Sequence, residues 1–442
     1  MIRLEEIGLP ELLLPEEQPI VPASEYERRL SGLRERVDAE AIVVYADREH
    51  FANIAFLTGL DPRFEEALLV LGDGRPALIL GTETTALASL VPIEIDVLHC
   101  PVLGLMGQDR SSGFTLQGAL SRAGIGAGRR VALVGWKYFE PNERLSFAVA
   151  AYVVDLLREL GVEVFDATEA LMNPRDGLRT TSGSDQIAAF EWAAARASAA
   201  VASVVRAAEP GLTEREAVAA MGYSGEQLSA HVMLASGPGL VGLRSPTDRR
   251  LERGDPITTA IGYWGGLSCR AGLLETGDDE YLERMAIPYW RAIVTWYEAV
   301  ALGVTGGDID LRVRDALAGT GFGSALNPGH LAHLDEWVHS PVRPGSDEPI
   351  RSGMCLQCDI IPDGAPPEWT ANCEDTVAVA DAGLRAELAE RHPGFWSRVQ
   401  ARQTFLRDRL GVGVADELLP LSAAPAWFPP FWLTPEQALL AD

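Results

Sequence analysis

The chain of 442 residues carries 63 acidic and 37 basic side chains, which gives a net charge of -26. This charge argues against nucleic acid and anionic membranes as partners, because both would be repelled. A hydrophobic fraction of 47% and a charged fraction of 23% are typical of a globular protein with two or three domains. No apolar run has transmembrane length, and the first residues lack the segments of a secretory signal, so we expect a cytoplasmic location.

The numbers of lysines and cysteines exclude further kinds of site and cross-link. Lys137 is the only lysine, so a phosphate-binding loop or a cofactor Schiff base is excluded at every other position. Five cysteines, an odd number in a long chain, do not form a disulfide framework. No Gly-rich nucleotide-binding motif follows a predicted strand, and no serine elbow is present, so no nucleotide cofactor is expected.

The first half of the chain alternates between strand and helix patterns. Flanking helices around a mixed sheet are the expected result. In chain order we predict a helix from a capping box at Ser24 and Glu27 to about Ala39, a strand over 41–45, a hairpin over 69–71 and 77–80, a strand over 131–134, a helix over 144–160 and a strand over 162–165.

A second domain follows the linker at residues 171–182. A long Ala-rich helix is predicted from Ser184 to Ala208, and Thr213 with Glu216 forms a capping box for the next one. Further helices are expected at about 279–301 and 308–319. The last 57 residues extend beyond this pattern with an Arg-rich helix and a Pro- and aromatic-rich segment, 424–432.

Four motifs in the second half resemble the pita-bread family of creatinase, aminopeptidase P, prolidase and methionine aminopeptidase. They are Asp248 to Asp255, Gly329-His330, Gly353 to Asp359, and Glu374-Asp375-Thr376, in this order and spacing. Phe56 to Gly59 also resembles a stretch of creatinase-type amino-terminal domains. The resemblance covers about residues 25–385 and implies an α+β chain: a creatinase-type mixed-sheet domain over 1–175, a pita-bread domain over 176–385 and a helical and aromatic extension over 386–442.

Most of that family binds two metal ions through two Asp, one His and two Glu. Here Ala260 stands at the first Asp position, and residues 256–274 contain neither Asp nor Glu. His330, Asp359 and Glu374 match the other three positions, so a single divalent metal on these residues remains an alternative. We expect no dinuclear centre, and the other interpretation of the three residues is a hydrogen-bonded polar cluster that holds no metal.

Creatinase resembles its metallopeptidase relatives in fold but works without metal, through a His and Glu residues. The position of that His falls on Leu243 here, beside Arg244, so an equivalent base must come from elsewhere. Three of the seven histidines lie within ten positions, at His330, His333 and His339, beside Asp335 and Glu336. A neutral His suits acid–base work near neutral pH, and a carboxylate such as Glu336 could orient it.

Cysteines near these motifs suggest two other interpretations. Cys355, Cys358 and Cys373 resemble zinc ligands in spacing, but strand alternation places Cys355 on the face of Asp359 and Cys358 on the other. The thiols of Cys358 and Cys373 are therefore expected to be buried hydrophobes. Cys269 lies in the stretch of the missing second Asp. A thiolate there, with a pKa lowered by Arg270, is the minor alternative to a pocket wall, and Arg270 is a candidate for binding a substrate carboxylate.

The predicted function is hydrolysis of a C–N bond in a small polar molecule or short peptide, without a dinuclear metal. The alternatives are a catalytically silent binding or scaffold protein and a single-metal Xaa-Pro peptidase. The family also implies a homodimer, and we expect the aromatic segment to pack across its interface. The candidate catalytic residues are His330, His333, Glu336, Asp359 and Glu374, and the candidate substrate-binding residues are Arg244, Cys269, Arg270 and His339.

Overall fold

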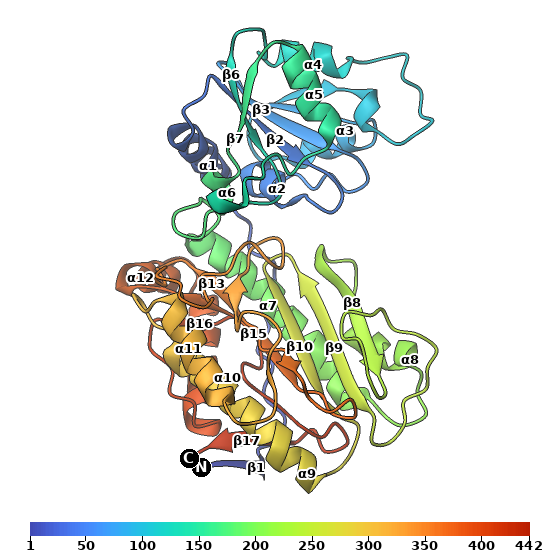
Figure 1. Ribbon diagram of the computed structural model, residues 1–442, viewed down its shortest axis with the longest axis vertical. Helices are drawn as coiled ribbons and strands as arrows, with labels where there is room; N and C mark the ends of the chain where they lie inside the picture. Colours follow the sequence, from blue (N-terminus) through green and yellow to red (C-terminus); the bar gives the residue numbers. More distant parts are fainter. The chain divides into compact units, whose positions relative to one another are not determined.

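A computed structural model describes all residues, 1–442, and the chain forms two compact units (Figure 1). The smaller unit comprises Val21–Thr180, and the larger combines Met1–Ile20 with Thr181–Asp442. The two compact units thus divide the chain after residues 20 and 180. The three-part division predicted from the sequence, 1–175, 176–385 and 386–442, stays a prediction. None of the helices combines the length and the apolar character needed to span a bilayer.

The smaller unit is built on a mixed sheet with the strand order β5-β4-β3-β2-β6-β7. Its strands pair antiparallel at β2–β3 and β3–β4 and parallel elsewhere. Every residue of β2 is buried, as its apolar composition predicts. The strands are β2 (Ala41–Ala46), β3 (Ala67–Leu71), β4 (Ala77–Leu80), β5 (Asp96–His99), β6 (Arg130–Val134) and β7 (Glu163–Asp166).

Two predicted helix starts in this unit are wrong. Helix α1 (Ala23–Arg36) begins one residue before Ser24, after an extended Pro22, and no side chain caps it. The helix expected from residue 144 begins only at α5 (Ala151–Glu159), because Arg144 and Phe147 have φ angles of 55° and 61°. The remaining helices are α2 (Ala52–Thr58), α3 (Thr84–Leu87), α4 (Leu116–Arg122) and α6 (Glu169–Met172).

The larger unit contains a curved sheet with the order β12-β13-β15-β10-β9-β8, and β16 also pairs with β15. The central hairpin of β9 and β10 pairs antiparallel from Pro256↔Leu273 to Tyr263↔Gly266. Its strands are β8 (Leu228–Ser236), β9 (Pro256–Tyr263), β10 (Gly266–Leu273), β12 (His330–Leu331), β13 (Cys355–Cys358), β15 (Asn372–Val379) and β16 (Leu418–Pro420), with a separate short pair, β11 (Gly323–Ser324) and β14 (Pro362–Asp363).

Helix α7 (Ser184–Ala207) runs along one face of β9 and β10, where its small alanine side chains allow close packing (Figure 1). The capping box predicted at Thr213 and Glu216 is confirmed at the start of α8 (Glu214–Val218), since both reciprocal hydrogen bonds are present. The other helices are α9 (Asp279–Tyr281), α10 (Ile287–Ala299), α11 (Gly306–Leu317), α12 (Ala382–Arg391) and α13 (Pro393–Thr404).

The aromatic segment near the carboxyl end packs inside its own unit. Trp427, Phe428, Phe431 and Trp432 are all buried, and Trp427 and Trp432 belong to a hydrophobic core shared with α7 and β9. The expectation that this segment packs across a dimer interface is therefore wrong. The chain then ends in β17 (Gln437–Ala441), which pairs antiparallel with β1 (Ile2–Glu6) and joins the two ends of the chain.

Candidate functional site

Three neighbouring strands place Ala260, Cys269 and Glu374 in one row across the sheet. Cys269 on β10 is directly opposite Ala260 on β9 and directly opposite Glu374 on β15. Directly opposed residues of antiparallel strands share a face, with Cβ atoms about 4.5–5.5 Å apart. Only the third member of this row is an acid, because β9 and β10 carry no carboxylate.

His330, Asp359 and Glu374 converge beside this row. One potential metal-binding atom from each of the three lies within 4.8 Å of those of the other two, and all three side chains are buried. His330 lies on β12 opposite Gln357 of β13, and Asp359 directly follows β13. The Gln357 amide donates to Glu374 Oε1 at 3.1 Å and holds that carboxyl in place. The structure thus assembles these three predicted residues in one cluster.

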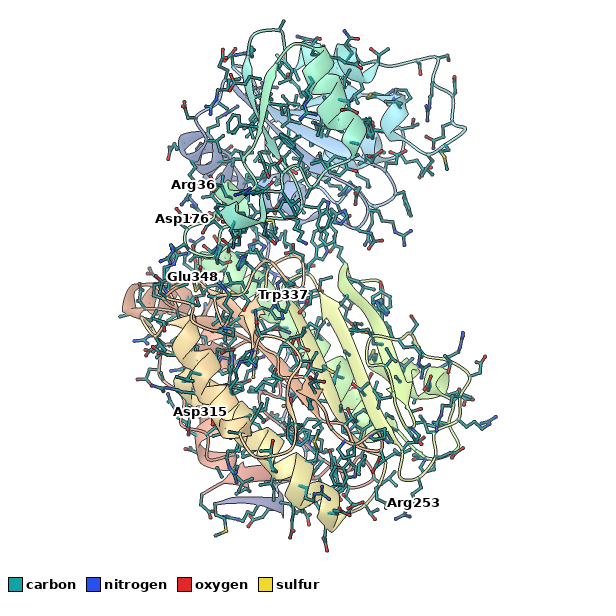
Figure 2. All side chains as sticks on the ribbon, viewed as in Figure 1. Arg36, Asp176, Arg253, Asp315, Trp337 and Glu348 are labelled. Atoms are coloured by element: carbon teal, nitrogen blue, oxygen red, sulfur yellow. The ribbon has the colours of Figure 1, made fainter.

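Glu336 and Trp337 adjoin His330. The Nε2 atom of His330 lies 2.9 Å from Glu336 Oε1, and Trp337, labelled in Figure 2, stacks on the imidazole with ring centroids 4.1 Å apart. Burial acts to lower the pKa of His330, but the charge of Glu336 and its hydrogen bond outweigh burial and raise this pKa above its ordinary value. The imidazole is therefore held in position and favoured in its charged form.

The two buried carboxyls of the cluster are short of positive partners. Burial raises the pKa of Asp359 to about 7, with His330 opposing the shift and Glu336 adding to it. Burial and the negative charges of Asp359 and Glu336 raise the pKa of Glu374 well above its ordinary value. The Oδ1 atom of Asp359 has no hydrogen-bond partner. The cluster would therefore be stabilised by an added cation or by protons.

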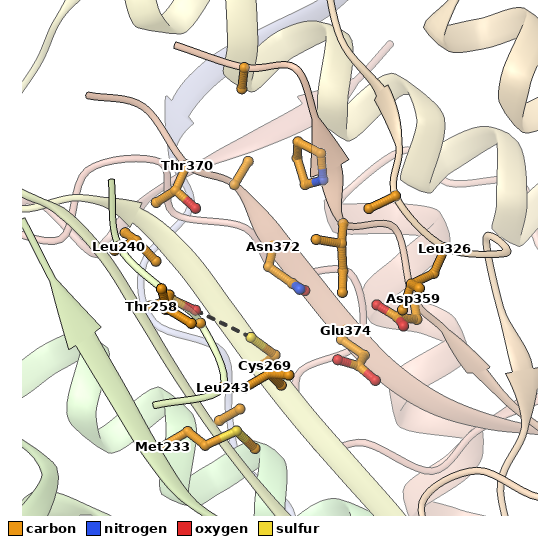
Figure 3. A pocket seen from close by; sticks show the side chains of 18 of the residues that line it. Met233, Leu240, Leu243, Thr258, Cys269, Leu326, Asp359, Thr370, Asn372 and Glu374 are labelled. Carbon is orange, nitrogen blue, oxygen red and sulfur yellow. Dashed lines mark hydrogen bonds between the residues drawn. The ribbon is translucent and has the colours of Figure 1, made fainter. Parts of the chain in front are cut away.

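A cavity of about 750 Å³ opens onto this cluster (Figure 3). The carboxyls of Glu336, Asp359 and Glu374 line it together with Cys269, whereas its remaining walls are mostly apolar. The side chains of Asp359, Glu374 and Cys269 come together in Figure 3. The apolar walls include Met233, Leu240, Leu243, Leu326, Trp337 and Trp369. A ligand with a positively charged group and an apolar body would match this distribution.

Cys269 belongs to the wall of this cavity, but it does not have the properties of a nucleophile. Its sulfur lies 3.5 Å from Thr258 Oγ1, the contact drawn in Figure 3. Burial and the negative charge of Glu374 raise the pKa of the thiol, and Arg270 opposes this only weakly. The alternative that Arg270 activates a Cys269 thiolate is therefore wrong.

Arg270 points to the other face of β10, as strand alternation requires. Its guanidinium binds Asp375 at 2.8 Å and donates to the carbonyl oxygens of Trp427 and Ala424 at 2.6 and 2.7 Å. Both partners of the ion pair are buried. The prediction that Arg270 binds substrate is wrong, because this side chain ties the sheet to the carboxyl-terminal segment.

Arg244 likewise forms an ion pair with another residue of the protein. Its guanidinium binds the buried Glu214 through two contacts of 2.7 and 2.8 Å, whereas the preceding residue, Leu243, lines the cavity. The prediction that Arg244 binds substrate is not supported by this placement. The importance of Glu214 was missed, because its partners Ser236, Arg244 and Thr247 lie 22 to 33 residues away in the chain.

The other two clustered histidines do not line this cavity. His333 is buried edge-on against Phe190, with ring centroids 4.9 Å apart, and the backbone carbonyl of His339 accepts from Leu331 at 2.7 Å. Wall residues such as Asn372 were not predicted, although alternation from Glu374 places Asn372 on the same face of β15.

The donor set suits one divalent ion but not two. His330, Asp359 and Glu374 offer one nitrogen and two carboxyl ligands, and the unpartnered Asp359 oxygen is available to a cation. A second ion would need further carboxylates from β9 and β10, which provide none. The residues present therefore do not fit a dinuclear centre.

Comparison with known proteins agrees with this architecture. The model of metallopeptidase family M24 matches residues 188–381. A probable dipeptidase PepE of Mycobacterium bovis is 29% identical over 248 residues, which cover 53% of this chain and 64% of the relative, less than two thirds of its length.

Solved structures extend the likeness to most of the chain. The prolidase of Pyrococcus horikoshii superposes with a TM-score of 0.63 at 15% identity, over 81% of this chain and 95% of that one. A prolidase of Thermococcus sibiricus gives 0.65 at 15% identity, over 90% and 96%, and the dipeptidase PepE of Mycobacterium ulcerans gives 0.60 at 23% identity, over 81% and 94%. These superpositions confirm the α+β fold, a mixed-sheet unit followed by a pita-bread unit. Residues 188–381 therefore match metallopeptidase family M24, and the chain has the fold of the pita-bread proteins.

Proposed function

We propose that this protein hydrolyses a C–N bond in a small molecule or short peptide, and that it does so without a dinuclear metal centre. The observation that carries the proposal is the convergence of Glu336, Asp359, Glu374 and the buried His330 at one cavity. These four groups can exchange protons, and their position at a mostly apolar cavity is suited to acid–base catalysis. The absence of acids from β9 and β10 leaves no ligands for a second ion.

The acidic part of the cavity also supports a substrate with a positively charged nitrogen group. The amino terminus of a short peptide or a small guanidino or amine compound would compensate the charges of Asp359 and Glu374. The apolar walls would contact the rest of such a molecule. Relatives named as dipeptidase and prolidase make short peptides the first substrates to test.

Proton transfer is assigned to Glu336 and His330. The Glu336 carboxyl lines the cavity and also contacts His330 Nε2, so it lies between the cavity and the imidazole. Trp337 stacks on the imidazole and holds its plane. We infer that Glu336 takes a proton from the water that attacks the carbon and gives it to the leaving nitrogen as the C–N bond breaks. In this step His330 stabilises the charged carboxylate, and Glu374 and Asp359 orient the substrate nitrogen.

A single divalent ion would replace this assignment, because a metal-bound imidazole is neutral and cannot also be the charged partner of Glu336. His330, Asp359 and Glu374 would hold it, and when bound it would polarise the scissile carbonyl. The alternative of a single-metal Xaa-Pro peptidase therefore uses the same cavity. A binding or scaffold protein without turnover is favoured by one observation, the lack of carboxylates at Ala260 and Cys269. A homodimer, a cytoplasmic location and the division into domains 1–175 and 176–385 with an extension over 386–442 are proposals as well.

The test is product formation, followed by mass spectrometry, from a panel of dipeptides, Xaa-Pro peptides and small guanidino or amide compounds. Purified protein is assayed with and without a chelator, beside Glu336→Gln, Glu374→Gln and the surface control Glu280→Gln. Glu280 has a side chain that is 64% exposed and pairs only with Arg284. Turnover that survives in the control and falls at least about 100-fold in the other two variants supports the proposal.

Two other results would change the proposed function. A ligand that raises the melting temperature without any product would favour the binding protein. Release of an amino-terminal residue that the chelator abolishes would favour the single-metal peptidase.

A further inference from the structure

Cys269 lies close to the cluster of His330, Asp359 and Glu374. It is directly opposite Glu374 in the pairing of β10 with β15, so the two side chains leave the sheet on the same face. Cys269 and Glu374 both line the cavity (Figure 3). The Cys269 sulfur contacts Thr258 and is not part of the cluster, so a rotation about its Cα–Cβ bond is needed to turn it toward the carboxyls.

The present contact of the thiol does little to prevent that rotation. The Cys269 sulfur and Thr258 Oγ1 are 3.5 Å apart, and a thiol is a weak donor and a weak acceptor. The thiol thus gives up little when it leaves Thr258.

A second and independent observation is a buried carboxylate oxygen without a hydrogen-bond partner. Asp359 is only 4% exposed, lines the cavity and has an Oδ1 atom with no hydrogen-bond partner. The positive group that acts on Asp359 is His330, which Glu336 also contacts. Buried carboxylates are normally hydrogen-bonded, paired or bound to metal, so this free oxygen is available to an incoming ion.

We propose that Cys269 supplies a thiolate as the fourth ligand of one zinc-class ion held by His330, Asp359 and Glu374. One nitrogen, two oxygens and one sulfur form the four-ligand set that Zn²⁺ and Co²⁺ bind tetrahedrally. Burial and Glu374 favour the protonated thiol, but a divalent ion beside the sulfur favours the thiolate. The thiol loses its proton to solvent as the metal–sulfur bond forms. A sulfur ligand also disfavours Mn²⁺ and Mg²⁺, which prefer oxygen.

None of the other cysteines of this unit, Cys355, Cys358 and Cys373, lines the cavity. The Cys373 sulfur lies 3.7 Å from the carbonyl oxygen of Trp427, on the opposite face of β15 from Glu374. Cys358 pairs with Asp375 across the strands and is likewise buried away from the cavity lining. Cys269 is thus the thiol of the sheet that lines this cavity.

The test is cobalt titration of chelator-treated protein, followed by near-ultraviolet and visible absorption. Wild type should bind about one equivalent of Co²⁺ and show the intense sulfur-to-cobalt charge-transfer band of a thiolate ligand. This band should vanish in Cys269→Ala and Cys269→Ser and persist in the matched control Cys373→Ala. In Cys269→Asp, the preference for Zn²⁺ over Mn²⁺ measured by competition should fall at least about tenfold.

Three results would overturn the inference. They are an absence of bound cobalt, one bound equivalent without the band, and a band that persists in Cys269→Ala. The inference rests on the single-metal alternative of the proposed function, because a bound ion would take Asp359 and Glu374 as ligands in place of a substrate nitrogen. Because the spectrum reports the ligand and product formation reports hydrolysis, either can fail while the other stands.

Discussion

The His330 imidazole and the Glu336 carboxyl form a pair, with Nε2 and Oε1 2.9 Å apart, in which the histidine is completely buried and the glutamate reaches the cavity. This arrangement gives the buried imidazole a contact with the cavity through a single carboxylate. It also makes the charge of His330 dependent on Glu336, since burial alone would lower the pKa of this histidine.

Glu336→Gln should therefore lower the pKa of His330. The glutamine keeps the size of the side chain but removes the negative charge that stabilises the imidazolium, so burial becomes the dominant effect. The measurement is an NMR titration of the His330 ring in metal-free protein, with His392, paired with Asp185 elsewhere, as the internal reference. An unchanged His330 titration in the variant would remove Glu336 from the proposed proton path.

Arg270→Met should destabilise the larger unit by about 3–5 kcal/mol, because it leaves the buried Asp375 without its positive partner. The double variant Arg270→Met with Asp375→Leu should recover part of this loss, since no charge is then left unpaired. Denaturant unfolding measures both. Arg253→Met, which breaks an exposed pair with Glu275, is the matched control and should change stability by about 1 kcal/mol or less. A stable Arg270→Met protein with a raised KM would instead return Arg270 to substrate binding.

Glu214 should make stability depend on acid pH. Burial acts to raise its pKa, but Arg244, Thr247 and Ser236 outweigh burial and lower the pKa to about 2. A pKa that is lower in the folded than in the unfolded state stabilises the fold above the unfolded value of about 4.3, and this stabilisation disappears as the pH falls toward 2. Glu214→Gln should thus cost about 2 kcal/mol at pH 7, and its deficit against wild type should shrink progressively below pH 4. A deficit that stays constant from pH 7 to pH 3 in denaturant unfolding would contradict this account.

Local patterns predicted much of the fold where neighbouring residues decide the structure. The Ala-rich helix from Ser184 and the capping box at Thr213 depend on residues within one or two turns, and both are confirmed. The helix expected from residue 144 failed because Arg144 and Phe147 take positive φ angles, which neither residue type signals. The pairing of β1 with β17 joins residues more than 400 positions apart, so no local pattern could indicate it.

The candidate site likewise contains features that the sequence predicted and features that depend on contacts between distant residues. Family motifs identified His330, Asp359 and Glu374, and the fold brings them together. Motifs did not reveal that Arg270 faces away from the cavity, although strand alternation beside Cys269 contains that information. The pairing of Cys269 with Glu374 depends on the register between β10 and β15, which is set by contacts more than 100 residues apart and was not predictable.

Trp432→Ala should destabilise the larger unit by about 3–5 kcal/mol, because it leaves a cavity in the core shared with α7 and β9. Phe64→Ala, at a side chain that is 64% exposed, is the control and should change stability by about 0.5 kcal/mol or less. Thermal unfolding measures the difference. A variant that keeps its melting temperature but changes its sedimentation coefficient would mean that the carboxyl-terminal segment acts in assembly rather than in the core.

The pairing of Ala260 with Cys269 allows the missing carboxylates to be restored together. In Ala260→Asp with Cys269→Asp, two new acids would face the cavity opposite each other, and Glu374 would lie across from the second. Without metal, the added acids should lower the melting temperature, since like charges would gather in a buried site that already raises the pKa of Asp359 and Glu374. With Mn²⁺ they should supply the oxygen ligands of a second ion, so the double variant should bind about two equivalents and melt well above its metal-free form. Elemental analysis and melting curves with and without Mn²⁺ test both halves. If the double variant is destabilised without metal but binds at most one ion, the loss of the two carboxylates cannot be what separates this cavity from a dinuclear site, and the difference must then lie in the pairing of His330 with Glu336.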